Sequence, residues 1–144
     1  MNEPRLRTIL LVLAVYHLLL GAFMFFAPGG FYDTLGKFPP ENHHYIKDVA
    51  TFYIALGIAY YVAVRYRSWR TPVLAFSAIE YGLHAINHLV DVGDATSDLT
   101  GWFDFFALAA LAVFFAALAS FAWRIHPEEP QPEPVADEDP HSGS

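Results

Sequence analysis

Residues 8–27 read TILLVLAVYHLLLGAFMFFA, an apolar run interrupted by His17. A bilayer core about 30 Å thick is crossed by a helix of roughly 20 such residues. A signal peptide would also place Arg5 and Arg7 before an apolar run, but its apolar region is usually only about 7–15 residues long. Pro28 also stands where a cleavage site would need a small residue. The stretch therefore predicts a transmembrane helix.

Three further apolar segments follow, separated by turn-forming or charged residues. Pro28, Gly29 and Gly30 should break the first helix and open a loop. We expect an all-α, polytopic membrane four-helix bundle in residues 1–125, with spans at about 8–27, 45–64, 72–92 and 102–123. Residues 126–144 are acidic and proline-rich, so we expect a disordered tail there.

The distribution of basic residues predicts an orientation. With four spans, the arginines Arg5, Arg7, Arg65, Arg67, Arg70 and Arg124 all fall on one side, and the opposite loops hold only Lys37 and Lys47. By the positive-inside rule, both termini should be cytoplasmic. We therefore expect a multi-pass protein of the bacterial plasma membrane, the cell inner membrane.

Composition narrows the classes of function and partner. Hydrophobic residues make up 55% of the chain and charged residues 16%, which fits a domain with the lipid bilayer as its partner. Cysteine is absent, which excludes disulfides and thiolate metal sites. No basic patch with interleaved aromatics supports nucleic acid binding. A homo-oligomer or a partner in a membrane complex stays open.

The third predicted span carries an unusual polar stripe, which consists of Glu80, His84, His88 and Asp91. At about 100° per residue, these four side chains lie within roughly 80° of one another around a helix. Ionisable groups inside a bilayer are costly and usually face the bundle interior with partners. The stripe is therefore the first candidate for a functional site.

Polar residues on the other spans lie at matching depths. His44 and Asp48 share a face of the second span, and Asp104 opens the fourth. Counting depth at about 1.5 Å per residue, Asp48 and Asp104 should share a layer with His88 and Asp91. Glu80, His84 and His17, which lies near the middle of the first span, should sit deeper.

Imidazoles and carboxylates that converge from several helices are how bundles build metal sites. Without thiolates, this set suits a transition metal ion (zinc, iron, manganese or copper(II)), in a mononuclear or dinuclear centre. Such a protein would be a metal-binding membrane protein, with oxidoreductase activity as one option. The candidate ligands are Glu80, His84, His88, Asp91, Asp48, His44, Asp104 and His17.

Three alternatives remain open from the sequence. His84 and His88 can be structural, paired with Glu80 and Asp91 along their own helix. The same residues can form a proton or ion relay, although the segment 73–79 offers only Ser77 for a path to the cytoplasmic side. A less favoured alternative is haem, with His17 and either His84 or His88 as axial ligands.

Several short features resemble a known group. The first span ends in Ala27-Pro28-Gly29, the following loop holds Phe31 and Gly36, and the second span contains Tyr53-x3-Gly57. In these features, over roughly residues 8–123, the chain resembles small four-span bacterial membrane proteins called DoxX-like. The resemblance implies the four-span architecture. It does not extend to the stripe on the third span.

Overall fold

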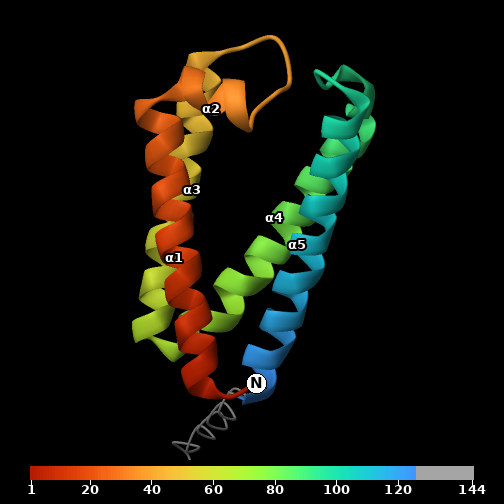
Figure 1. Cartoon of the computed structure of the whole chain (residues 1–144). Coiled ribbons are helices and arrows are strands. Elements are labelled where there is room, and N and C mark those ends of the chain that lie inside the picture. The colour runs from red at the N-terminus through yellow and green to blue at the C-terminus, as the bar shows by residue number, and fades with distance from the viewer. Residues whose placement is uncertain (126–144) are drawn as a thin grey trace, which may run out of the picture.

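The computed structural model describes residues 1–125, and this part of the chain is all-α (Figure 1). Its helices are α1 (Glu3–Phe26), α2 (Pro28–Thr34), α3 (His43–Arg65), α4 (Arg70–Val90) and α5 (Asp98–Ile125), with short 3-10 turns η1 (Arg67–Trp69) and η2 (Val92–Asp94). The all-α prediction is confirmed. The predicted tail, residues 126–144, lies outside the described residues.

The helices begin before the apolar runs, because polar residues cap them. The Asn2 side chain accepts a hydrogen bond from the backbone N–H of Arg5 at the start of α1. The Asn42 side chain does the same for His44 and Tyr45 in α3. Such caps satisfy backbone donors that have no partner inside the helix. α1 and α3 can therefore start outside the apolar stretches that defined their predicted spans.

The predicted break after the first span is present, but the segment that follows it contains a short helix as well as a loop. α1 ends at Phe26, and Ala27 has a non-helical backbone. Residues 28–34 then form the short helix α2. Proline suits the first position of a helix, because the N–H that it lacks would have no partner there. Pro28 therefore ends one helix and begins the next.

Within residues 1–125, three helices are long and apolar enough to cross a membrane: α1, α3 and α5. α4 has 21 residues, about 32 Å at 1.5 Å per residue, so its length also suffices. Its polar side chains lower its hydropathy, which sets it apart from the other three.

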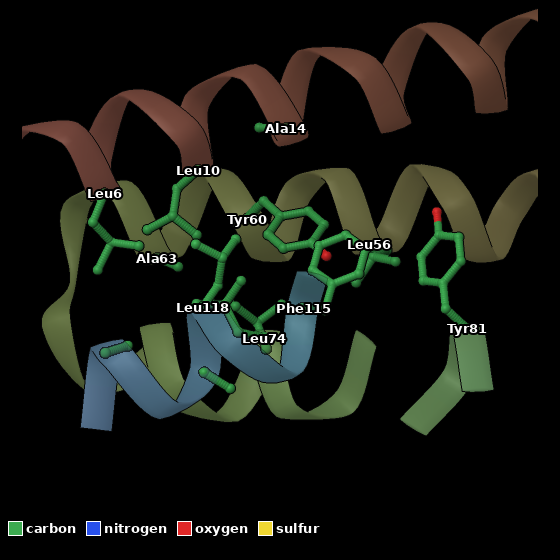
Figure 2. Packing of buried hydrophobic residues seen from close by; sticks show 13 residues of the cluster. Leu6, Leu10, Ala14, Leu56, Tyr60, Ala63, Leu74, Tyr81, Phe115 and Leu118 are labelled. Atoms are coloured by element: carbon green, nitrogen blue, oxygen red, sulfur yellow. The ribbon is translucent and has the colours of Figure 1, made fainter. Parts of the chain in front are cut away.

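The four long helices form two packed pairs. α1 packs along α3, and α4 packs along α5. The pairs converge near the N-terminus and diverge toward the end that carries α2 (Figure 1). The main apolar cluster lies in the converging half, where Leu10, Tyr60, Leu74 and Phe115 bring all four helices together (Figure 2). A smaller cluster of Met24, Ala50 and Tyr53 joins α1 to α3 nearer α2.

An ion cluster fastens the converging end. The Arg67 guanidinium donates to both Glu3 carboxylate oxygens, at 2.8 and 2.7 Å. The Arg70 side chain is 2% exposed, and it donates to the Ala63 carbonyl at 3.1 Å and to Glu3 at 3.5 Å. A buried guanidinium needs partners of this kind. These contacts link the start of α1 to the turn between α3 and α4.

Two glycines permit the close packing of α1 on α3. A Cβ atom at Gly57 would lie 2.8 Å from Leu18 Cγ and 3.1 Å from the Ala14 carbonyl oxygen. At Gly21 a Cβ would lie 2.7 Å from Ile54 Cγ1. Small residues let helices approach closely in membranes, where packing drives helix association.

We expect Gly57→Ala to destabilise the protein by about 1–3 kcal/mol, because the added methyl overpacks the α1–α3 contact. Gly82→Ala is the matched control: its Cβ would meet only Ala112 Cβ, at 3.9 Å. The control should be neutral or stabilising by up to about 1 kcal/mol, because alanine favours helix. Unfolding in detergent, followed by circular dichroism, measures both. Equal effects would contradict the packing.

Candidate functional site

α4 presents opposite chemistry on its two sides. Large apolar side chains are exposed every three or four residues along it: Phe76, Ile79, Leu83, Ile86 and Val90, with the polar Asn87 exposed near its end. Its buried side includes Ser77, Tyr81 and Ala85. Glu80, His84, His88 and Asp91 are partly buried, between these extremes. A helix with an apolar outer stripe and polar inner groups is suited to lipid rather than water.

The structure brings His84 and His88 together. Their Nε2 atoms lie 3.2 Å apart, and the ring centroids 4.9 Å. Glu80 lies on the other side of His84, with Oε1 3.7 Å from Nδ1, an ion-pair distance rather than a hydrogen bond. The predicted i, i+4 spacing thus produces a row of three interacting groups.

Two carboxylates act on this row electrostatically. Asp104 of α5 interacts with both imidazoles, and Asp91 interacts with His88. The sequence predicts Asp104 at the depth of His88 and Asp91, and α5, which carries Asp104, packs along α4. The candidate site is formed by α4 and α5, and its members are Glu80, His84, His88, Asp91 and Asp104.

The loop between α2 and α3 reaches this site. The edge of the Phe38 ring faces His88, with the centroids 4.6 Å apart and the planes at 83°. The Lys37 carbonyl accepts a hydrogen bond from the Thr96 backbone N–H at 3.2 Å. Phe38 therefore covers one side of His88, and the loop connects the two helix pairs where they diverge.

Two buried side-chain atoms of the site have no hydrogen-bond partner within residues 1–125: Glu80 Oε2 and His88 Nδ1. Leaving a polar atom buried and unpaired costs roughly 1–3 kcal/mol. Such groups in a folded protein call for an explanation, such as an ion, a water or a catalytic role. Both atoms without partners belong to the polar stripe of the third predicted span.

His17 lies in a different place from the His84 pair. It is 1% exposed, its Nδ1 donates to the Leu13 carbonyl at 2.7 Å, and its Nε2 accepts from the Tyr81 hydroxyl at 3.0 Å. Its ring stacks on Tyr53 and contacts Tyr60. Both ring nitrogens of His17 are therefore occupied by hydrogen bonds. This favours a structural role, a junction at which His17 of α1 meets Tyr81 of α4, over a role as a metal or haem ligand.

The tyrosines around His17 were not singled out from the sequence. Tyr53, Tyr60 and Tyr81 are all buried, and the Tyr60 hydroxyl hydrogen-bonds to Ser77, which donates to the Val73 carbonyl. Their positions within the predicted spans could have identified them, because tyrosine in membrane helices usually lies at the interface. A tyrosine at mid-span needs a partner for its hydroxyl group.

His44 and Asp48 lie apart from the α4 site. They pair with each other at 3.4 Å across one turn of α3, and their side chains are 79% and 62% exposed. Within residues 1–125, no hydrogen bond or ion pair joins either residue to α4. The shared depth along the chain does not bring them together with His88, because the α1–α3 pair and the α4–α5 pair diverge at this end of the protein (Figure 1).

The described residues hold no group of three or more His, Asp or Glu side chains already placed to hold a metal ion. Comparison of the chain with protein-family models, curated proteins and solved structures gives no match. What can be said of function therefore rests on the geometry of the site.

We expect Tyr81→Phe to lower stability by about 1–3 kcal/mol, because it leaves the buried His17 Nε2 without its donor. Tyr16→Phe is the control, since Tyr16 is 52% exposed and lies on the same helix as His17. It should change stability by less than about 0.5 kcal/mol. Denaturant titration in mixed micelles measures both variants. A neutral Tyr81→Phe would show that the hydrogen bond does not support the junction.

Proposed function

We propose that this chain is a four-span membrane protein that binds one transition metal ion between α4 and α5, with His84 and His88 as ligands. The observation that carries the proposal is the 3.2 Å separation of the two Nε2 atoms. Two nitrogens, each about 2.0–2.1 Å from one metal ion at a tetrahedral angle, lie about 3.3–3.4 Å apart. The separation of the two Nε2 atoms, which also allows a hydrogen bond between the rings, is therefore close to that of a ligand pair.

The surroundings of the pair support this role. Asp104, which acts on both imidazoles from α5, is the candidate for a third ligand. Glu80 lies behind His84 Nδ1, where a carboxylate orients a ligating imidazole and raises its basicity. Glu80 therefore serves as a positioning residue here, and Asp91 supplies further negative charge beside His88.

This donor set of nitrogen and oxygen suits zinc, iron, manganese or copper(II). With two imidazoles and one carboxylate, a bound ion would keep a coordination position for water or a substrate, and would act there as a Lewis acid. The side chains of the chain hold the ion, orient the ligands and, through Phe38, restrict access to His88.

The fourth span of the proposal is α4. Its support is the exposed stripe of large apolar residues that extends from Phe76 to Val90, over most of the helix. Such a stripe would be unfavourable in water and is what a lipid-facing surface needs. By the positive-inside rule, the arginines at the converging end support the proposal that both termini are cytoplasmic, with the metal site in the outer half of a bacterial plasma membrane.

A second candidate function is a proton relay, favoured by a specific observation. Polar groups continue inward from His88 and His84 to Glu80, and Tyr81, the next residue in the chain, hydrogen-bonds to His17 of α1. The hydrogen bond between Tyr60 and Ser77 lies about one helical turn closer to the converging end, which carries the arginines. Within α4, the segment 73–79 offers only Ser77 for a proton path. His17 of α1 and Tyr60 of α3 would extend that path.

We expect the purified parent protein to carry a stoichiometric transition metal, measured by elemental analysis. His88→Ala should lose most of it, because one of the two imidazole ligands is gone. Glu80→Gln should keep the site but weaken metal affinity by about 10- to 100-fold, the usual effect of losing an orienting partner. His44→Ala is the matched control, a histidine that also faces an acid one turn away, and it should bind metal as the parent does.

The relay is distinguished by the same variants in liposomes. Parent protein that is folded, free of metal and conducts protons, with conduction lost in Glu80→Gln, would replace the metal proposal by the relay. A folded parent with neither metal nor conduction would leave the pair a structural feature and contradict both proposals.

The topology predicts opposite labelling of two single-cysteine variants. The chain has no cysteine, so Ser68→Cys and Thr96→Cys each introduce one thiol, and both positions are exposed. In intact cells, an impermeant maleimide should label Thr96→Cys but not Ser68→Cys. Permeabilised cells should label both. Labelling of both in intact cells would mean that α4 does not cross the membrane.

A further inference from the structure

An apolar groove lies between α3 and α4, in the half of the protein near the arginine-rich end. Its volume is about 370 Å³, within the range of about 300–1,000 Å³ of small-molecule sites. Every side chain that lines it is apolar, and none belongs to the metal site described above. It is therefore a separate feature of the surface.

The groove follows from how α3 and α4 are joined. Ala55 and Ala59 line it from α3, and their small side chains leave space beside the helix. Phe52 and Phe76 contact each other with ring centroids 6.0 Å apart, at the end away from the η1 turn. The distance from Phe52 to Ala59 along α3 is about 10 Å at 1.5 Å per residue, most of one leaflet's hydrocarbon depth of roughly 15 Å.

The other end of the groove has the chemistry of a membrane interface. Trp69 and Pro72 line it there, and Trp69 is 50% exposed. Tryptophan is enriched at the level of lipid headgroups, with an apolar ring and one N–H donor. A ligand in the groove would thus pass from an apolar interior to a polar exit beside the indole.

Arginines lie close to this exit along the chain, within four residues of Trp69. Arg65, the last residue of α3, is exposed, and within residues 1–125 it has no ion-pair partner. Arg67 is paired with Glu3 yet remains 61% exposed. Among the described residues, this end of the bundle carries six arginines and one acid, Glu3. The exit therefore attracts an anion, whereas the groove admits only an apolar chain.

We propose that the groove holds an acyl chain of one anionic phospholipid, with its phosphate beside Arg65 and Trp69. Anionic headgroups gain about 1 kcal/mol from each nearby arginine. A second copy of this chain is a poorer occupant, because two copies inserted in the same direction would bring their arginine-rich ends together. The inference rests on the proposed membrane placement but not on the metal.

Native mass spectrometry of the full chain, released from detergent, tests the proposal with phosphatidylglycerol and phosphatidylcholine of identical acyl chains. The parent should retain one phosphatidylglycerol, at least about fivefold more tightly than phosphatidylcholine. Arg65→Gln should reduce this preference several-fold. Ala59→Phe should lose both lipids, because the ring fills the groove, and Ala55→Phe repeats the test at a more exposed position.

Two matched variants serve as controls. Arg5→Gln removes an exposed arginine from the same end, on α1, and Ala117→Phe adds a ring to an exposed position of α5. Both should bind lipid as the parent does. Unchanged retention in folded Ala59→Phe and Ala55→Phe would overturn the proposal, and so would a parent dimer that these variants convert to monomer. Failure of the labelling test of Ser68 and Thr96 would instead refute the membrane placement.

Discussion

The separation of the polar side chains of α4 from its exposed apolar face is the constraint on which the rest of the structure depends. Burying the ionisable side chains Glu80, His84 and His88 against hydrocarbon would cost several kcal/mol each. α4 is rotated so that Ile79, Leu83 and Ile86 are exposed, whereas Ser77 and Tyr81 are buried. α5 then supplies most of the surface against which the other side of α4 packs.

The position of the shared core explains where a site can form. All four long helices meet in the half that contains Leu10, Tyr60, Leu74 and Phe115, and the ion cluster of Glu3 fastens its end. Toward α2 the two pairs diverge and are connected by the loop that holds Phe38 (Figure 1). Side chains on α4 and α5 can there be partly buried without being enclosed by a close-packed core. His84 and His88 lie in that half.

The proposed metal ion and the proposed lipid occupy opposite halves of the bundle. The first uses nitrogen and oxygen donors between α4 and α5, and the second uses an apolar surface between α3 and α4. The junction of His17 with Tyr60 and Tyr81 separates the two regions and satisfies its own polar groups internally. A change at either site can therefore be tested without altering the residues of the other.

The sequence by itself determined the all-α fold, the breaks at Pro28 and in the turn at Arg67, and the row of Glu80, His84 and His88. These follow from local rules: apolar length, helix-breaking residues and the angle between residues on one helix. Its prediction that Asp104 shares a layer with His88 stays a prediction, and α5, which carries Asp104, packs along α4.

Only the tertiary structure decided which side chains meet across helices. Depth along a span is readable from a sequence, but the rotation of each helix about its axis is set by packing. Gly57 and Gly21 bring α1 against one face of α3, and this packing leaves His44 and Asp48 on an exposed face. The same packing buries Tyr53 and Tyr60 around His17, so that its nitrogens bind Leu13 and Tyr81 instead of joining the row on α4.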